Sequence, residues 1–143
     1  MDLKGGRTMA LPPQRVAILD DDQSVRTAIS RLLKTSGIDA VGYATSTDLL
    51  NSLERELPDC IVLDLQMPGM TGTDVMHYLS HAGIRVPIVI ITAHDELGSP
   101  EACLAAGASA YLRKPLDADE LIRAIGGAIA AFPANQRLGP RSN

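Results

Sequence analysis

Asp64 stands directly after an apolar run and before a turn, a position at which open α/β sheets bind their ligands. The run is Cys60-Ile61-Val62-Leu63, and the turn is marked by Pro68-Gly69. A run of this length and composition predicts a buried strand of a parallel sheet that ends at Asp64. A carboxylate at such a place can bind a cation or act as a nucleophile.

Three further apolar runs lead into side chains that contact metals or phosphates. They are residues 16–19, followed by Asp20-Asp21-Asp22; residues 88–91, followed by Thr92; and residues 110–112, followed by Lys114-Pro115. Since the carboxyl ends of parallel strands meet at one edge of a sheet, we expect carboxylates, a hydroxyl and an ammonium group to lie together there.

The carboxylates at this edge would repel one another and raise each other's pKa without a counter-ion. A divalent cation removes the difficulty, and ligands that are all oxygen favour Mg²⁺ or Mn²⁺ over zinc. Asp20, Asp21 and Asp64 are the expected ligands, directly or through water, with the main-chain carbonyl of Gln66 as a further one. For Asp22, two roles are equally favoured: it belongs to this acidic group, or it only caps the helix that follows it.

Lys114 and Thr92 suit a phosphoryl group better than acid–base hydrolysis. Lys114 can place a positive charge on one phosphoryl oxygen, and Thr92 can donate its hydroxyl to another. A carboxylate beside Mg²⁺ can itself attack phosphorus and give an acyl phosphate. His77 and His81 have the helical spacing of a metal-binding pair, but we expect both on the exposed side of their helix.

Five short apolar runs alternate with helical patterns between Arg15 and about Phe132. This alternation is typical of a parallel sheet covered by helices on both faces. Ser46 is the expected cap of the second helix, and Asp117 with Glu120 has the spacing of a capping box. The expected buried helix residues are Val25, Ile29, Leu32 and Leu33; Leu49, Leu50, Leu53 and Leu57; Val75, Met76 and Leu79; and Leu121, Ile122, Ile125 and Ile129.

The fourth helix differs from the others in composition. It is expected to start at Ser99-Pro100, and its body over residues 102–106 offers only Leu104 as a large aliphatic anchor. Few buried contacts lower local stability, so this helix is either a moving part or a short, well-packed alanine helix.

The chain of 143 residues fits one domain. We expect an N-terminal tail over residues 1–14, a domain over 15–132, and a C-terminal tail or the start of a linker over 133–143, because both ends lack periodicity. Basic residues are scattered among acidic ones, and Arg26 is expected on the solvated surface. The net charge of −4 argues against direct nucleic-acid binding.

Membrane and export signals are absent from the sequence. No apolar stretch approaches the roughly 20 residues that span a bilayer, and the N-terminus has no secretory signal. We therefore expect no membrane contact and a cytoplasmic location. Cys60 and Cys103 lack the spacing of metal ligands and are expected to be buried free thiols.

Four blocks of this sequence together resemble the receiver domain of bacterial two-component response regulators. The blocks are residues 18–22, residues 63–72, Ile91-Thr92-Ala93, and Gly107-Ala108 followed by Tyr111 and Lys114-Pro115. They occur in the family's order and spacing, and the resemblance covers about residues 15–131. Any one block alone would be a weak signal, whereas all four together are specific.

The resemblance implies a flavodoxin-like, doubly wound α/β fold with a five-stranded parallel sheet in the order 2-1-3-4-5 and five helices. Asp64 would be the phosphoacceptor, with Asp20 and Asp21 holding Mg²⁺ and a cis peptide at Lys114-Pro115. The remaining roles would fall on Thr92, Ala93 and Lys114 for contact with the phosphoryl group, on Thr92 and Tyr111 for the switch, and on Gln66 and His94 for tuning dephosphorylation.

The function implied by the resemblance is phosphorelay signal transduction. A sensor histidine kinase or a phosphotransfer protein would supply the phosphoryl group. Phosphorylation would then change the face of helix four, strand five and helix five for a downstream output protein or domain. The chain would catalyse only its own phosphorylation and dephosphorylation, and would not otherwise be an enzyme.

Two other functions agree with parts of the sequence. In a haloacid-dehalogenase-like phosphatase, Asp20 and Asp22 would form the Asp-x-Asp motif, but Asp64 is then unexplained and the acidic pair expected after Lys114 is lacking. A pseudo-receiver that serves only as an interaction module is the second alternative, although every phosphorylation residue is present. The variant Asp64→Asn would distinguish the three functions.

Overall fold

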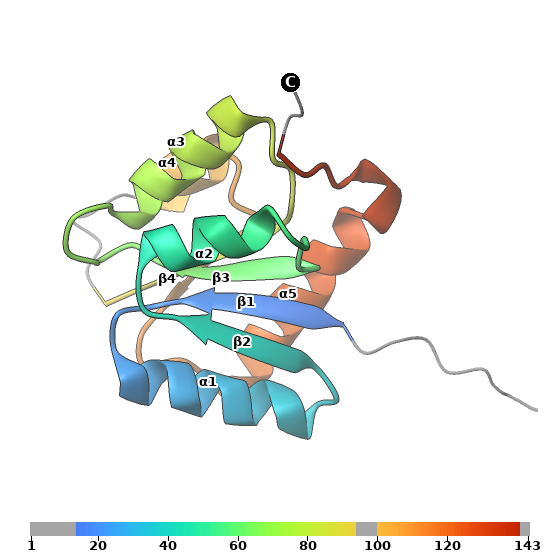
Figure 1. Cartoon of the computed structure of the whole chain (residues 1–143). Coiled ribbons are helices and arrows are strands. Elements are labelled where there is room, and N and C mark those ends of the chain that lie inside the picture. Colours follow the sequence, from blue (N-terminus) through green and yellow to red (C-terminus); the bar gives the residue numbers. More distant parts are fainter. Residues whose placement is uncertain (1–13, 94–99, 141–143) are drawn as a thin grey trace, which may run out of the picture.

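A five-stranded parallel sheet lies between two layers of helices (Figure 1). The computed structural model describes residues 14–93 and 100–140, and its strand order β2-β1-β3-β4-β5 confirms the expected fold. The strands are β1 Arg15–Leu19, β2 Asp39–Tyr43, β3 Cys60–Asp64, β4 Ile88–Thr92 and β5 Ala110–Arg113. The helices are α1 Gln23–Thr35, α2 Ser46–Leu53, α3 Gly72–Ala82, α4 Pro100–Ala105, α5 Ala118–Ala131 and the short 3₁₀ helix η2 Ala134–Gln136.

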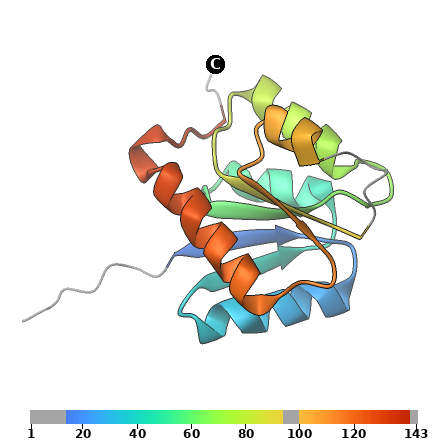
Figure 2. The same cartoon turned by 180° about the vertical axis from the view of Figure 1, so that it is seen from behind.

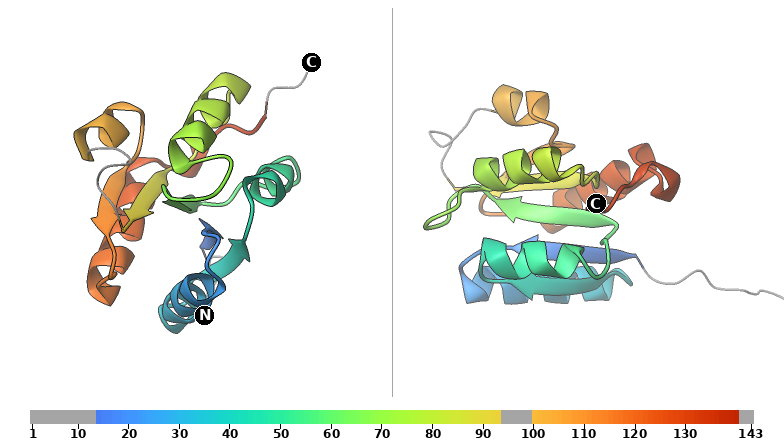
Figure 3. Two further views of the ribbon diagram at one scale, coloured as in Figure 1. Left: turned by 90° about the vertical axis from the view of Figure 1, so that its left-hand side faces the viewer. Right: turned by 45° about the horizontal axis from the view of Figure 1, so that its top comes forward.

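Alternate residues of each central strand face the two layers. In β3, Ile61 and Leu63 pack in one core with residues of α2, α3 and α4, whereas Cys60 and Val62 pack in the other with α1 and α5. Figure 2 shows α5 crossing the second face. Because both faces are covered, every residue of β3 and β4 is buried, including the polar residues Asp64 and Thr92 that end them. The carboxyl ends of the strands face the viewer in the left view of Figure 3.

Side-chain caps mark the starts of the helices, and the cap of α2 differs from the predicted one. The hydroxyl of Thr45, not that of Ser46, accepts the N–H of Asp48 at 3.1 Å and caps α2, so the prediction for Ser46 is wrong by one residue. Asp117 caps α5 as expected by accepting the N–H of Glu120 at 2.9 Å. A capping box with both of its bonds is present at the start of α3.

Helix α4 rests on the sheet through small residues, and the prediction that Leu104 anchors it is wrong. Leu104 is 48% exposed, whereas its neighbour Cys103 is 4% exposed and lies in the core with Ala108. Consecutive helical residues point about 100° apart, so only one narrow face of this six-residue helix can meet the sheet. The predicted start at Ser99 lies outside the described residues.

The chain after α5 folds back along the amino ends of the strands. Arg137 forms an ion pair with Asp59, which precedes β3, and donates to the carbonyl of Phe132 at 3.1 Å. Leu138 pairs with Arg85, which precedes β4, through two backbone hydrogen bonds of 2.8 and 2.9 Å. Part of the segment predicted as a tail is thus in contact with the domain, and the boundary at residue 132 stays a prediction.

Candidate functional site

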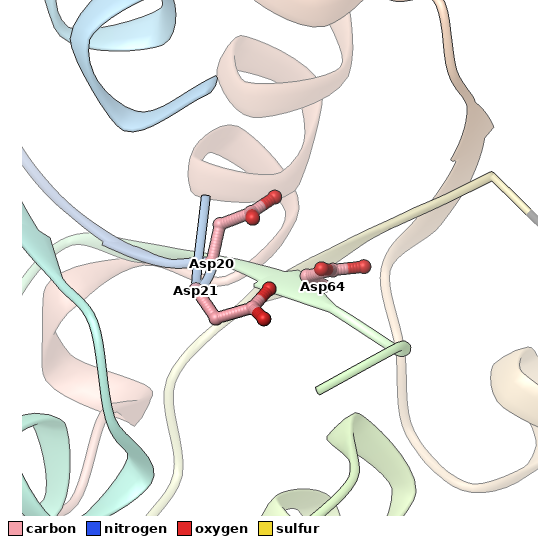
Figure 4. A group of neighbouring side chains, drawn as sticks. All are labelled: Asp20, Asp21 and Asp64. Atoms are coloured by element: carbon pink, nitrogen blue, oxygen red, sulfur yellow. The ribbon is translucent and has the colours of Figure 1, made fainter. Parts of the chain in front are cut away.

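Asp20, Asp21 and Asp64 meet where the neighbouring strands β1 and β3 end (Figure 4). One carboxylate oxygen from each of them lies within 4.8 Å of the other two. Asp20 and Asp64 are buried, Asp21 is exposed, and all three line a hollow of about 490 Å³ together with Gln66 and Lys114. The carboxylates that the sequence predicts as ligands are therefore brought together.

Asp64 is only 2% exposed, and this burial raises the pKa of its carboxyl group to about 6. The Gln66 N–H, which donates to Oδ1 of Asp64 at 3.1 Å, opposes the rise. The negative charges of Asp20 and Asp21 add to the rise, and the positive charge of Lys114 lowers the pKa again. Asp64 is thus a more basic carboxylate than an exposed aspartate, and a nearby cation would favour its ionised form.

Lys114 reaches the carboxylates from the segment after β5. Its Nζ lies 2.9 Å from Oδ2 of Asp20 and 3.6 Å from Oδ2 of Asp64. Burial by itself would lower the pKa of Lys114, but the hydrogen bond to Asp20 and the charge of Asp64 outweigh it, so this pKa is raised. The ammonium group is therefore charged and faces both buried acids. The Lys114–Pro115 peptide is cis, as the resemblance implies.

Asp22 caps α1 and lines the same hollow, but it is not one of the three clustered carboxylates. Its Oδ1 accepts the N–H of Ser24 at 2.9 Å and the Ser24 hydroxyl at 2.6 Å, which holds the pKa of Asp22 below its usual range. Its own N–H donates to Oδ1 of Asp20 at 2.9 Å, so the cap also orients the neighbouring carboxylate. Of the two roles left open for Asp22, the structure supports capping.

Arg26 is a residue of this site that the sequence does not identify. One of its guanidinium nitrogens donates to the main-chain carbonyl of Asp20 at 2.8 Å, and its side-chain stem lies against Gly42 of β2. It is half-buried, so its expected place on the solvated surface is wrong. Its position four residues after the capping Asp22 puts it one helical turn on, where it returns to the end of β1.

Thr92 is fully buried at the end of β4, and its carbonyl accepts the N–H of Lys114 at 2.8 Å. Ala93, the next residue, is exposed. Tyr111 of β5 is half-buried, pairs in register with Ile90 of β4 and packs against the core that also contains Cys103 of α4. His94 lies outside the described residues.

The donor set of the acidic group consists of oxygens, which fits Mg²⁺ or Mn²⁺. Three carboxylates face a single ammonium group, so a further positive charge would be stabilised here. His77 and His81 are exposed on α3, as expected. Within residues 14–93 and 100–140, the only group of three or more metal-binding side chains is the one formed by Asp20, Asp21 and Asp64.

Comparison with known proteins gives one consistent result. The model of the response regulator receiver domain matches residues 16–126. The response regulator protein TodT of Pseudomonas putida is 32% identical over 137 residues, which cover 96% of this chain and 60% of TodT. The DNA-binding transcriptional regulator NtrC of Klebsiella pneumoniae is 31% identical over 120 residues, which cover 84% of this chain and 26% of NtrC.

A solved structure gives the same result. The crystal structure of a response regulator receiver protein from Burkholderia phymatum superposes with a TM-score of 0.73 at 44% identity, covering 82% of this chain and 95% of that one. This chain thus spans less than two thirds of TodT and NtrC, but nearly all of the Burkholderia phymatum receiver protein.

Proposed function

The chain belongs to the family of response regulator receiver domains, which act in two-component signalling, and on this basis we propose that Asp64 is its phosphoacceptor. The observation that carries the proposal is the placement of a buried, basic carboxylate at Asp64 within reach of Lys114 and two further acids. That combination suits phosphoryl transfer, because Lys114 and a cation held by the two acids can balance negative charge as the acyl phosphate forms.

The phosphoryl group would come from a phosphohistidine of a sensor histidine kinase or a phosphotransfer protein. The ionised carboxylate of Asp64 attacks phosphorus, a P–O bond forms while the P–N bond breaks, and the histidine leaves with that bonding pair. The raised pKa of Asp64 makes it a better nucleophile than an exposed aspartate, provided that the pH is high enough to ionise it.

Asp20, Asp21, Asp64 and the main-chain carbonyl of Gln66 would hold Mg²⁺, or Mn²⁺ in its place. The ion, when bound, supplies positive charge that offsets the carboxylates and the incoming phosphoryl group. Asp22 and Arg26 would hold the end of β1 in place through their bonds to Asp20.

The phosphoryl oxygens would be contacted by the hydroxyl of Thr92, the main-chain N–H of Ala93 and the ammonium group of Lys114. Movement of Thr92 toward the phosphoryl group would vacate space into which Tyr111 turns. The face formed by α4, β5 and α5 would change as a result and become available to a downstream output protein or domain. Gln66, exposed at the rim of the hollow, and His94 are proposed to tune dephosphorylation.

The further parts of the proposal follow from this role. The domain would catalyse only its own phosphorylation and dephosphorylation and would bind neither nucleic acid nor membrane. No helix within the described residues is long and apolar enough to cross a bilayer. Cys60 and Cys103 are buried free thiols, and burial raises the pKa of Cys60 to about 12. Because the two cysteines are buried in opposite cores, their unpaired state does not depend on the compartment, and we propose the cytoplasm from the family's role in two-component signalling.

The two alternatives have less support. A haloacid-dehalogenase-like phosphatase would need Asp22 beside Asp20 in the reacting group, but Asp22 is engaged as a helix cap. A pseudo-receiver does not need charged groups assembled for phosphorylation, yet Lys114 and Asp20 form an ion pair at the edge of the sheet.

The proposal is tested by incubation with acetyl phosphate and Mg²⁺, followed by intact mass. The expected result is one added phosphoryl group in the wild type and in Asp39→Asn, an exposed control on β2, and none in Asp64→Asn or in the presence of a chelator. Modification of Asp64→Asn would refute the assignment. Turnover of a phosphate ester by Asp64→Asn would favour the phosphatase, and an unmodified wild type would favour the pseudo-receiver.

A further inference from the structure

Gly72, the first residue of α3, lies against the main chain that carries Asp64. A Cβ atom at Gly72 would stand 2.8 Å from the carbonyl oxygen of Asp64 and 2.9 Å from the Cα of Leu65. Both neighbours are backbone atoms, and close-packed backbone cannot give way as the end of a flexible side chain can. The N–H of Gly72 also donates to the carbonyl of Leu65 at 3.2 Å. Any side chain at this position would therefore push α3 and the end of β3 apart.

Neither partner in this contact can move at low cost. The end of β3 is held by its pairing with β4, including the hydrogen bond from Leu65 N–H to the Ile91 carbonyl at 3.1 Å. The start of α3 is held by the capping box of Thr71 and Asp74, whose two bonds measure 3.0 and 3.2 Å. One turn further on, Val75 is fully buried in the core.

The segment that would move contains two groups assigned to the site. Asp64 carries one of the three clustered carboxylates, and its Oδ1 accepts the N–H of Gln66, whose carbonyl is a proposed ligand. Asp20 and Asp21 follow a different strand, β1, and would keep their positions. A side chain at Gly72 would thus change the spacing between the two halves of the site.

We infer that Gly72 is a positioning residue: its lack of a side chain lets α3 dock on the Asp64–Leu65 main chain, and this contact sets Asp64 relative to Asp20 and Asp21. The inference rests on the proposed function of the site. Gly69, Gly126 and Gly127 differ from Gly72, since nothing lies within 4 Å of a Cβ at any of the three.

The test uses a parent protein with Gly126→Ala and Gly127→Ala. Both sites are exposed in α5, where alanine favours the helix, so the parent tolerates a destabilising change. In this parent, Gly72→Ala is compared by calorimetric titration with Mg²⁺ alone, with the folded fraction taken from circular dichroism. We expect at least tenfold weaker Mg²⁺ binding per folded molecule, and slower modification by acetyl phosphate even at saturating Mg²⁺.

Leu79→Ala is the matched control, because it removes packing from the same helix two turns away from Gly72 and adds no atom near Asp64. It should lower the unfolding midpoint and keep the Mg²⁺ dissociation constant within twofold of the parent. Gly72→Ala with a dissociation constant within twofold of the parent would overturn the inference.

If Gly72→Ala stays unfolded in this parent, Thr71→Ala decides, since it loosens the start of α3 and keeps the glycine. It should weaken Mg²⁺ binding at least threefold, and unchanged binding would overturn the inference. A parent that binds Mg²⁺ but is never modified at Asp64 would refute the phosphoacceptor proposal alone, and the Mg²⁺ comparison would still decide the role of Gly72. A parent that binds no Mg²⁺ would overturn both the phosphoacceptor proposal and the inference about Gly72.

Discussion

The ammonium group of Lys114 lies 2.9 Å from a carboxylate oxygen of Asp20. This ion pair joins the segment after β5, at one edge of the sheet, to the end of β1, from which β5 is separated by β3 and β4. Without a bound metal, the lysine places a positive charge beside the carboxylate oxygens of both buried acids. A cation bound by Asp20 would take over part of this role.

Replacement of Lys114 by methionine should therefore be costly without metal, because it leaves the buried carboxylate of Asp20 unpaired. We expect the free energy of unfolding at pH 7.5 to fall by about 2 to 4 kcal/mol in urea titrations with chelator. Saturating Mg²⁺ should recover part of the loss. Lys34→Met, on the exposed last turn of α1, is the control and should change stability by less than about 0.5 kcal/mol. A loss at Lys114 that Mg²⁺ leaves unchanged would contradict the shared role.

The raised pKa of Asp64 predicts a pH dependence of stability in metal-free protein. Its pKa is about 6 when folded and 3.8 for the ordinary group, so the folded state binds more protons in this window and loses stability as pH rises through it. Relative to Asp64→Asn, the wild type should lose about 1 kcal/mol between pH 5 and pH 7.5. Parallel stability curves for the two proteins would show that Asp64 ionises as an exposed aspartate does.

Mg²⁺ should stabilise the protein through Asp20 and Asp21, because the unfolded chain lacks the assembled site. Saturating excess should raise the free energy of unfolding by about 1 to 3 kcal/mol, and the double variant Asp20→Ala/Asp21→Ala should lose this response. Thr45→Ala is the matched control, since it removes the cap of α2 and should lower stability while keeping the response to Mg²⁺. An equal Mg²⁺ response in wild type and double variant would exclude the cation site.

The segment after α5 should contribute to the stability of the domain. Arg137 is nearly buried in its ion pair with Asp59, so Arg137→Ala should lower the free energy of unfolding by about 1 to 3 kcal/mol. The ion pair of Arg15 with Glu56 provides the comparison, because both side chains are solvent-exposed and Glu56→Ala should cost less than about 1 kcal/mol. If Arg137→Ala unfolds at the same urea concentration as wild type, the segment is not part of the folded unit.

Phosphorylation at Asp64 should change amide exchange in α4 and β5, because Thr92 lies between these elements and the acidic site. With beryllofluoride, a mimic of the acyl phosphate, we expect altered amide exchange over residues 100–113 and little change in α2. Such a shift needs only that the mimic favour one of two existing states. Thr92→Ala should still accept phosphate on Asp64 but lose the exchange response. A wild-type response in Thr92→Ala would rule out this route.

The sequence by itself determined the strands and the residues at their ends. Apolar runs and the polar residues that close them are local features, so the edge that collects Asp20, Asp64, Thr92 and Lys114 follows once the strands are parallel. The strand order was implied by the resemblance to receiver domains that four motif blocks carry, because periodicity alone leaves the order of strands open.

Only the tertiary structure decided the distances between residues of different elements and which face of each helix is buried. Leu104 and Cys103 are neighbours in one helix, and when the helix packs against the sheet the small cysteine is buried and the leucine stays exposed. Arg26 reads as a surface charge until α1 is placed beside β1, where its guanidinium group meets the carbonyl of Asp20. Gly72 reads as one more turn glycine until α3 docks on β3. Each of these roles depends on atoms from another element, and local sequence does not encode how closely two elements approach.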